Sequence, residues 1–307
     1  MADLQQGKYI WKNGEFVAWR DATTHILTHA LHYGTAVFEG MRCYKTDEGS
    51  IVFRLIEHME RLEQSASFIM MDLPYTASEL VEATAELIRM NELESCYVRP
   101  IAYRGYGSMG VNPRPAPIDV AIAVWPWDAY LGAEALENGL SAGISSWRQR
   151  SINATPGAIK SSASYLNSGL AHMEALDHGY GEAILLNESG HVAEGSGENI
   201  FVVKNGALKT PPLSDGVLAG ITRDSLIQLA RYFELEVSEA SLARTDLYGA
   251  DEIFFTGSAA EVTPIASIDN RVIGNGRRGH ITEKLQTAFF DVVAGRIAEF
   301  EPWLYTV

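Results

Sequence analysis

Strand-like and helix-like patterns follow one another along this chain without a regular alternation. Some segments alternate apolar and polar residues, as strands do, and others repeat apolar residues every three or four positions, as helices do. The expected strands are a hairpin at 9–19 turning at Asn13-Gly14, then 51–54, 96–103, 118–125, 140–147, 182–187, 199–204 and 252–256; the expected helices are 57–70, 80–88 behind a Thr76–Glu79 capping box, about 165–178, 221–233 and 281–297. Because a doubly wound sheet needs strands and helices in regular turn, this order predicts the α+β class.

The length of the chain predicts more than one domain. Its 307 residues exceed what one hydrophobic core usually supports, and the 47% of hydrophobic residues is enough for a folded protein. Apolar periodicity lapses between Asp128 and Asn138. We therefore expect an N-terminal α/β domain at 1–128, a linker at 129–138 and a C-terminal domain at 139–307.

The charge and the cysteines limit the expected partners and compartment. Lysine and arginine number 24 against 39 aspartate and glutamate residues, a net charge of −15. Such a surface repels phosphate backbones and anionic lipid, so we expect neither nucleic acid nor membrane as partner, although a local pocket can still bind an anionic substrate. Cys43 and Cys96 cannot make a disulfide framework, and no segment is typical of a signal peptide or membrane span. These features favour a cytoplasmic protein.

Three patterns suggest other chemistries, and each has a simpler explanation. Residues 105–110 match G-x-G-x-x-G, but the prolines at 113, 115 and 117 prevent the helix that a dinucleotide site requires. His25, His29 and His32 have the helical spacing of zinc ligands, yet no carboxylate follows at a suitable distance. We interpret them as packed histidines bonded to the backbone or to neighbours, and predict no metal. The G-x-S-x-G pentapeptide of serine hydrolases does not occur.

Lys160 is the most informative single residue. It is the only lysine between Lys45 and Lys204, and residues 155–165 around it are small, hydroxylic and otherwise uncharged. Desolvation in such surroundings lowers the pKa of a lysine and frees its amine as a nucleophile. A loop lysine packed along its stem has the same pattern, so Lys160 alone leaves both interpretations open.

Glu194 makes the chemical interpretation of Lys160 stronger. It is followed by Gly195 and Gly197, which allow a ligand to approach the backbone closely. A nucleophilic lysine and a carboxylate suit pyridoxal phosphate, whose aldehyde needs the amine and whose ring nitrogen needs an acidic partner. Gly220 opens a predicted helix and residues 256–261 form a donor-rich loop, either of which can bind phosphate or be an ordinary cap or turn.

The ordered motifs resemble a known family over essentially the whole chain. Lys160-x4-Tyr165, AEGSGENIF (193–201), AGIT (219–222) and TGSAAEVTP (256–264) are similar to the class IV, fold-type IV aminotransferases. HALHYGTAVFEGMR (29–42), YVRP (97–100), GVNP (110–113) and PWDAYLG (126–132) resemble their branched-chain amino acid group. The resemblance implies a two-domain α+β fold, with a smaller α/β N-terminal domain, a larger barrel-like C-terminal domain and pyridoxal 5'-phosphate between them.

The resemblance also assigns roles to individual residues. Lys160 is the implied catalytic residue, binding the cofactor aldehyde and moving the proton between Cα and C4′. The implied cofactor-binding residues are Arg61 at the phosphate, Tyr165 at the ring 3-oxygen, Glu194 at the ring nitrogen, and Lys160, Gly197, Ile221, Thr222 and Ser258. The implied substrate-binding residues are Tyr33, Phe38, Gly40, Tyr97, Arg99, Trp127, Tyr130, Ala259 and Ala260, with Met109 and Val111 from a neighbouring subunit.

The implied reaction is transamination between leucine, isoleucine or valine and 2-oxoglutarate, in two half-reactions through a Schiff base. Relatives acting on D-amino acids or (R)-amines, an aminodeoxychorismate lyase and a catalytically silent binding protein are the alternatives. The resemblance further implies a homodimer or a higher assembly such as a hexamer. One departure is Ala219, where many relatives have proline; because backbone donors bind the phosphate, we expect activity to be retained.

Overall fold

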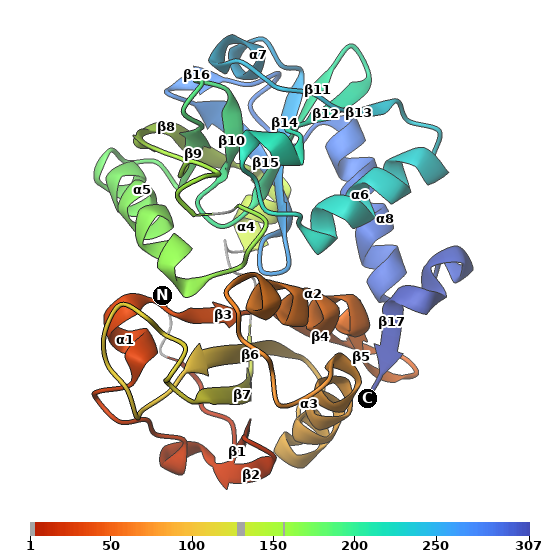
Figure 1. Cartoon of the computed structure of the whole chain (residues 1–307). Helices are drawn as coiled ribbons and strands as arrows, with labels where there is room; N and C mark the ends of the chain where they lie inside the picture. Colours follow the sequence, from red (N-terminus) through yellow and green to blue (C-terminus); the bar gives the residue numbers. More distant parts are fainter. Residues whose placement is uncertain (1–3, 128–132, 156) are drawn as a thin grey trace. The chain divides into compact units, whose positions relative to one another are not determined.

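The computed structural model describes residues 4–127, 133–155 and 157–307. The chain divides into two compact units, each with its own sheet and helices (Figure 1). The first contains Met1–Asp128, Ile159–Ala163 and Val292–Val307, and the second contains Ala129–Ala158 and Ser164–Asp291. This mixed content confirms the α+β class. Tyr130 and part of the expected linker lie outside the described residues.

An antiparallel sheet forms the centre of the first unit. Its described strands run in the order β17-β5-β4-β6-β7-β1-β2, with β3 paired to β6. Their bounds are β1 Tyr9–Lys12, β2 Glu15–Ala18, β3 Ala36–Phe38, β4 Met41–Thr46, β5 Gly49–Phe53, β6 Cys96–Arg104, β7 Ile118–Trp125 and β17 Leu304–Thr306. Asn13 and Gly14 both have positive φ, the conformation of a two-residue hairpin turn, so the predicted hairpin is confirmed.

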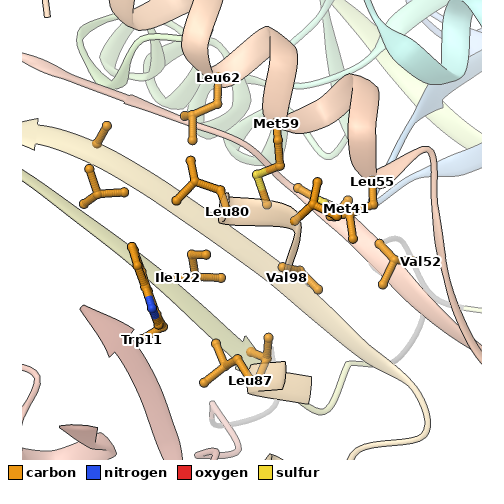
Figure 2. Close-up of a cluster of buried hydrophobic side chains, with 14 of the residues drawn as sticks. Trp11, Met41, Val52, Leu55, Met59, Leu62, Leu80, Leu87, Val98 and Ile122 are labelled. Atoms are coloured by element: carbon orange, nitrogen blue, oxygen red, sulfur yellow. The ribbon is translucent and has the colours of Figure 1, made fainter. Parts of the chain in front are cut away.

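Two helices cover one face of this sheet. The helices α2 (Leu55–Phe68) and α3 (Ala77–Asn91) bury their apolar stripes against the strands. Figure 2 shows Met59 and Leu62 of α2 and Leu80 of α3 beside strand residues of the same core. The predicted capping box is confirmed, because Thr76 and Glu79 exchange side-chain and backbone hydrogen bonds at the start of α3. The helix α1 (His29–Tyr33) and two 3-10 turns, Trp19–Asp21 and Ala298–Trp303, complete the unit.

The second unit contains a larger, mixed sheet that curls into a half-barrel. Its described strands run in the order β10-β9-β8-β15-β14-β11-β12-β13, with β16 on β15. Their bounds are β8 Leu140–Arg148, β9 Glu182–Leu186, β10 Val192–Gly195, β11 Asn199–Lys204, β12 Ala207–Thr210, β13 Val237–Glu239, β14 Glu252–Gly257, β15 Glu261–Ile268 and β16 Arg271–Val272. The first half of β15 pairs with β14 and its second half with β8, so the sheet turns a corner along this strand.

Helices flank this second sheet. The helix α5 (Tyr165–Asp177) lies beside β8 and β9, and α6 (Ile221–Tyr232) lies beside β14 (Figure 1). The others are α4 (Ala133–Asn138), α7 (Arg244–Tyr248) and α8 (His280–Val293), with 3-10 turns at Ser162–Ser164 and Leu213–Asp215. The sequence did not predict α4, β10, β13, β15, β16 or α7 of this unit. Most of these are too short to show a period, and β15 follows a turn whose small residues suggested a loop.

The simpler interpretation is confirmed for the glycine motif and only in part for the histidines, because His29 is buried whereas His25 and His32 are exposed. Residues 105–117 form no helix, so the G-x-G-x-x-G match has no dinucleotide context. The helix α1 begins only at His29, and each of the three imidazoles bonds to a nearby residue or backbone group. In the described part of the chain, no helix combines the length and hydrophobicity needed to cross a membrane.

The α2 core supplies a test of the packing. Leu62 is fully buried between α2 and the sheet, whereas the adjacent Glu63 is exposed. We expect Leu62→Ala to lower the free energy of unfolding by about 2–5 kcal/mol, because it removes buried apolar volume and leaves a cavity. Glu63→Ala should change it by less than about 0.5 kcal/mol. Urea unfolding of both variants checks this, and equal effects would contradict the packing described here.

Candidate active site

Lys160 is fixed in the first unit through its backbone. Its carbonyl accepts a hydrogen bond from the Phe38 amide (3.0 Å), and its amide lies 3.4 Å from the Ser65 hydroxyl of α2. Ser161 bridges to Val37 of β3 in antiparallel fashion. The Lys160 Nζ lies 5.2 Å from the centroid of the Phe38 ring. The lysine therefore belongs to the sheet of the first unit, although the chain on both sides of 159–163 belongs to the second.

Several predicted substrate residues adjoin Lys160 on the same unit. The Arg99 guanidinium lies 4.8 Å from the Phe38 ring and 5.2 Å from the Tyr97 ring. The Tyr97 ring lies 5.0 Å from that of Trp127. Gly40 touches this group so closely that an added Cβ would lie 2.0 Å from the Tyr97 hydroxyl oxygen. The structure thus brings together Lys160 and five of the substrate-binding residues expected from the sequence.

Arg61 is held in a buried ion cluster. This cluster was not predicted from the sequence. The Glu39 carboxylate accepts hydrogen bonds from Arg61 Nε (2.6 Å) and Nη2 (2.8 Å), and from His58 Nδ1 (2.7 Å). Burial raises the carboxyl pKa of Glu39, but Arg61 and His58 together lower it well below its usual range. Burial lowers the pKa of His58, against the opposing effect of Glu39. A glutamate inside the apolar run 36–41 was the available sequence signal.

Glu194 is at the centre of the site residues of the second unit. It lies in β10, and its carboxylate accepts hydrogen bonds from Gln149 Nε2 (2.5 Å), the Leu218 amide (3.0 Å) and Asn199 Nδ2 (3.3 Å). Gln149 and Asn199 are themselves buried. These donors favour the charged form of the acid and fix its direction. Neither Gln149 nor Asn199 was predicted as a site residue.

Asn199 also positions the start of α6. Its amide donates to the Leu218 carbonyl (3.0 Å), and its Oδ1 would lie 1.9 Å from a Cβ added to Gly220. Gly220 is the N-cap of α6, so the next residues, Ile221 and Thr222, begin that helix. The first turn of a helix offers unsatisfied amide donors to an anion. The glycine is needed here for close packing against Asn199.

A second donor-rich turn lies against the loop that follows Glu194. Residues 258–260, which include the predicted Ser258, Ala259 and Ala260, form the turn between β14 and β15. A Cβ added to Gly257 would lie 3.7 Å from the Gly197 carbonyl oxygen, so the loop with Gly197 adjoins this turn. The Thr256 hydroxyl is fully buried without a hydrogen-bond partner in the described residues, beside this turn. Such an atom fits a site that receives a polar ligand group.

Tyr165 begins α5, and the structure associates it with an arginine that was not predicted as a site residue. Burial lowers the pKa of Arg150, while the charges of Glu194 and Tyr165 act to raise it. In the described residues the Arg150 Nε and Nη1 atoms have no hydrogen-bond partner. Of the other predicted pocket residues, Tyr33 lies on α1 and Met109 and Val111 lie in the loop 105–117, and all three are exposed.

Each unit by itself carries groups that suit a phosphorylated pyridine aldehyde: the first an amine and a guanidinium, the second a carboxylate and helix-start and turn amides. The family model described as amino-transferase class IV matches residues 36–268. The chain belongs to the class IV aminotransferases. This confirms the family resemblance drawn from the sequence.

Curated class IV aminotransferases are similar to this one over nearly their full length. A branched-chain-amino-acid aminotransferase of Salmonella typhimurium is 48% identical over 301 residues, covering 98% of this chain and 97% of that protein. A protein of the same name from Pseudomonas aeruginosa is 47% identical, covering 96% of this chain and 95% of its own length.

Solved structures agree with the fold of this class IV aminotransferase. The branched-chain amino acid aminotransferase of Escherichia coli has a TM-score of 0.96 at 48% identity, covering 97% of this chain and 99% of that chain. The branched-chain amino acid aminotransferase of Thermobaculum terrenum, solved in its PLP form, has a TM-score of 0.92 at 38% identity, covering 98% of each chain. The expected fold-type IV architecture, with its barrel-like sheet, is therefore confirmed.

The ion cluster around Glu39 predicts a pH-dependent loss of stability. A carboxylate with a lowered folded-state pKa stabilises the fold above its unfolded pKa, and this contribution disappears as the pH falls below that value. We expect Glu39→Gln to lower the free energy of unfolding by about 3 kcal/mol at pH 7, since it leaves Arg61 without its buried partner. The difference from the unmodified protein should shrink below about pH 4.3, where unfolded glutamate is protonated.

Urea unfolding at pH 7, 5 and 3.5 measures this difference. Glu63→Gln, on the exposed face of α2, is the matched control and should follow the unmodified protein at every pH. A Glu39→Gln penalty that stays constant down to pH 3.5 would show that the charge of Glu39 is not what stabilises the cluster.

Proposed function

We propose that this protein is a pyridoxal-phosphate-dependent transaminase that moves amino groups between leucine, isoleucine or valine and 2-oxoglutarate. The observation that carries the proposal is the placement of Lys160 beside Phe38, within a group of aromatic rings around the Arg99 guanidinium. The similar proteins from Salmonella typhimurium and Pseudomonas aeruginosa, whose names state this activity, support the choice of substrate.

The proposed cofactor supplies an electron-accepting ring and a carbonyl carbon that takes up the substrate amino group. Lys160 would hold this carbon through Nζ, and its amine, once displaced by the substrate amino group, would carry the proton between substrate Cα and C4′. The backbone hydrogen bonds of Lys160 to Phe38 and Ser65 support this role, because they fix the base of a long flexible side chain.

Glu194 holds a proton on the ring nitrogen in this proposal. Its carboxylate accepts from Gln149, Leu218 and Asn199, which keeps it anionic and aligned. An anionic acid that faces a pyridine nitrogen stabilises the protonated ring, and a protonated ring accepts electrons from Cα more readily. Tyr165 hydrogen-bonds the 3-oxygen of the same ring.

The phosphate is bound by one guanidinium and by helix-start and turn donors. The Arg61 side chain is already fixed by Glu39, so little entropy is lost when it binds an anion. The remaining proposed phosphate contacts come from Gly197, Ile221, Thr222 and Ser258. The buried Thr256 hydroxyl beside the Ser258 turn agrees with a polar group in this position.

The proposed substrate pocket accepts both an aliphatic side chain and the distal carboxylate of glutamate. Tyr97 and the turn at 258–260 bind the α-carboxylate. Arg99 binds the distal carboxylate, and its contacts with the Phe38 and Tyr97 rings support this role, because aromatic faces can hold a cation within an apolar pocket. The aromatic rings then face a leucine side chain when no carboxylate is present. Tyr33 and Gly40 complete this wall, and so does Tyr130, which lies outside the described residues.

We also propose a homodimer or higher assembly in which the loop 105–117 contributes to the pocket of a second subunit. Val111 is 90% exposed and Met109 is 44% exposed, so both apolar side chains are accessible to a second subunit. The buried, unlinked Cys43 and Cys96 agree with a reducing cytoplasm as the proposed location. The expectation of no nucleic-acid or membrane partner stays a prediction.

The visible absorption of the purified protein tests the reaction. With bound pyridoxal phosphate, the band of the aldehyde form should change to that of the amine form on adding L-leucine, and return on adding 2-oxoglutarate. Lys160→Ala should lower turnover by at least about a thousandfold, because the covalent link and the proton carrier are lost together. Lys204→Ala removes an exposed lysine paired with Asp251 and should keep full activity.

Two outcomes would contradict the proposal. A band that does not respond to L-leucine but responds to a D-amino acid or an (R)-amine would support the proposed cofactor and refute the proposed substrate. A Lys160→Ala variant with nearly full activity would refute the proposed role of Lys160 in the mechanism.

The contact between Gly40 and Tyr97 gives a second test, directed at the pocket. The Cβ of Gly40→Ala would overlap the Tyr97 hydroxyl, so the ring must move away from the proposed α-carboxylate position. We expect KM for leucine to rise about tenfold, the loss of roughly one hydrogen bond to a charged group. Affinity for pyridoxal phosphate should not change. Gly181→Ala, where the added Cβ makes only ordinary contacts, is the control.

A further inference from the structure

His29 is a fully buried histidine that the proposed chemistry does not use. It is 0% exposed, and both ring nitrogens have hydrogen-bond partners. Nε2 lies 2.7 Å from the Gly110 carbonyl oxygen, and Nδ1 lies 2.8 Å from the Thr35 hydroxyl. The ring therefore connects α1 and the start of β3 to a loop more than seventy residues later in the chain.

The partners determine which ring nitrogen donates. A carbonyl oxygen only accepts, so the Nε2 hydrogen must be donated to Gly110. In the neutral ring Nδ1 then accepts from the Thr35 hydroxyl, which fixes the orientation of the imidazole. The backbone amide of His29 adds a third bond, to the Gly105 carbonyl (3.1 Å). One residue thus fixes both ends of the segment 105–110.

This segment has an irregular backbone that the His29 bonds fix, together with the hydrogen bond from the Gly105 amide to the Pro117 carbonyl (2.7 Å). Residues 105–111 form neither helix nor strand, and Gly107 and Gly110 have φ values of 146° and 122°. The exposed Met109 and Val111 flank the carbonyl that His29 binds. On its other side the imidazole packs against the half-exposed Tyr33, with ring centroids 4.5 Å apart.

We propose that His29 is a positioning residue for substrate specificity, which holds the loop 105–111 so that Met109 and Val111 form one wall of the substrate pocket in the partner subunit. The inference rests on the proposed function and assembly.

Two substitutions separate the hydrogen bonds of His29. In His29→Gln the amide nitrogen can occupy the place of Nε2 and still donate to Gly110. In His29→Asn it can reach only the place of Nδ1, so the Gly110 bond is lost. We expect His29→Asn to raise KM for leucine about tenfold with kcat within about twofold, and His29→Gln to stay within about threefold of the unmodified enzyme. Pyridoxal phosphate affinity should be unchanged in both.

A backbone variant tests the same loop without touching the buried ring. Gly110→Ala places a side chain at φ 122° with nothing within 4 Å of its Cβ, so it acts only through the backbone. Gly49→Ala has the same open surroundings at φ 126°, at the first residue of β5, and is the matched control. Gly110→Ala should raise KM for leucine as His29→Asn does, and Gly49→Ala should not.

Mixed dimers of two tagged chains test whether the effect crosses to the partner. One chain carries Lys160→Ala and the other carries His29→Asn. The only pocket with a competent lysine is therefore that of the His29→Asn subunit. The loop that completes this pocket comes from the Lys160→Ala subunit, in which His29 is intact. We expect this dimer to regain the leucine KM of the unmodified enzyme. A KM that stays raised would place the effect within one subunit and overturn the proposal.

The remaining outcomes separate this proposal from the proposed function. An unmodified enzyme that does not react with leucine would refute the function. A leucine-active enzyme whose KM is unchanged in both His29→Asn and Gly110→Ala, or one that is monomeric in sedimentation, would refute the role of His29 alone. Equal effects of His29→Asn and His29→Gln would show that the Gly110 bond is not the cause.

Discussion

The hydrogen bond between the Lys160 carbonyl and the Phe38 amide organises the proposed chemistry of this protein. Phe38 is the last residue of β3, which pairs with β6 in a fixed antiparallel register. The same strand β6 contains Tyr97 and Arg99, so one sheet sets the distance from Lys160 to these two proposed substrate-binding residues. A side chain as flexible as lysine gains precision in this way, because its backbone is bonded to the scaffold that holds its neighbours.

Two glutamates, the buried Glu39 and the partly buried Glu194, are stabilised in the same way in different units. Glu39 accepts from Arg61 and His58, and Glu194 accepts from two side-chain amides and a backbone amide. Removing a carboxylate from water is costly, and the cost is offset only when its oxygens receive several well-placed donors. The charge of Glu39 fixes the Arg61 guanidinium by two hydrogen bonds, whereas the amides that donate to Glu194 are neutral.

The sequence predicted best those features that depend on local chemistry. The Asn13-Gly14 turn and the Thr76–Glu79 capping box are set by a few adjacent residues, and both were predicted correctly. The motifs around Lys160 and Glu194 were recognisable because lysine is scarce there and glycine is frequent. The donors to Glu194 were not predicted, because Gln149 and Asn199 meet it only after β8, β10 and β11 have folded. Nor could periodicity show that 159–163 joins the first sheet, since a five-residue stretch has no period.

The first unit is built from three separate segments of the chain, and this affects how it folds during biosynthesis. Its edge strand β17 pairs with β5 from some 250 residues earlier, and the lysine segment arrives between these two. Pairings this distant in sequence form slowly, because a long loop must close before any bond is gained. On the ribosome, β5 is synthesised long before β17, with which it pairs. The edge of β5 that β17 later covers therefore stays open while the whole second unit is made. The exposed strand is a transient risk for wrong pairing in the cell, and the nascent chain needs protection at that edge until Leu304–Thr306 arrives.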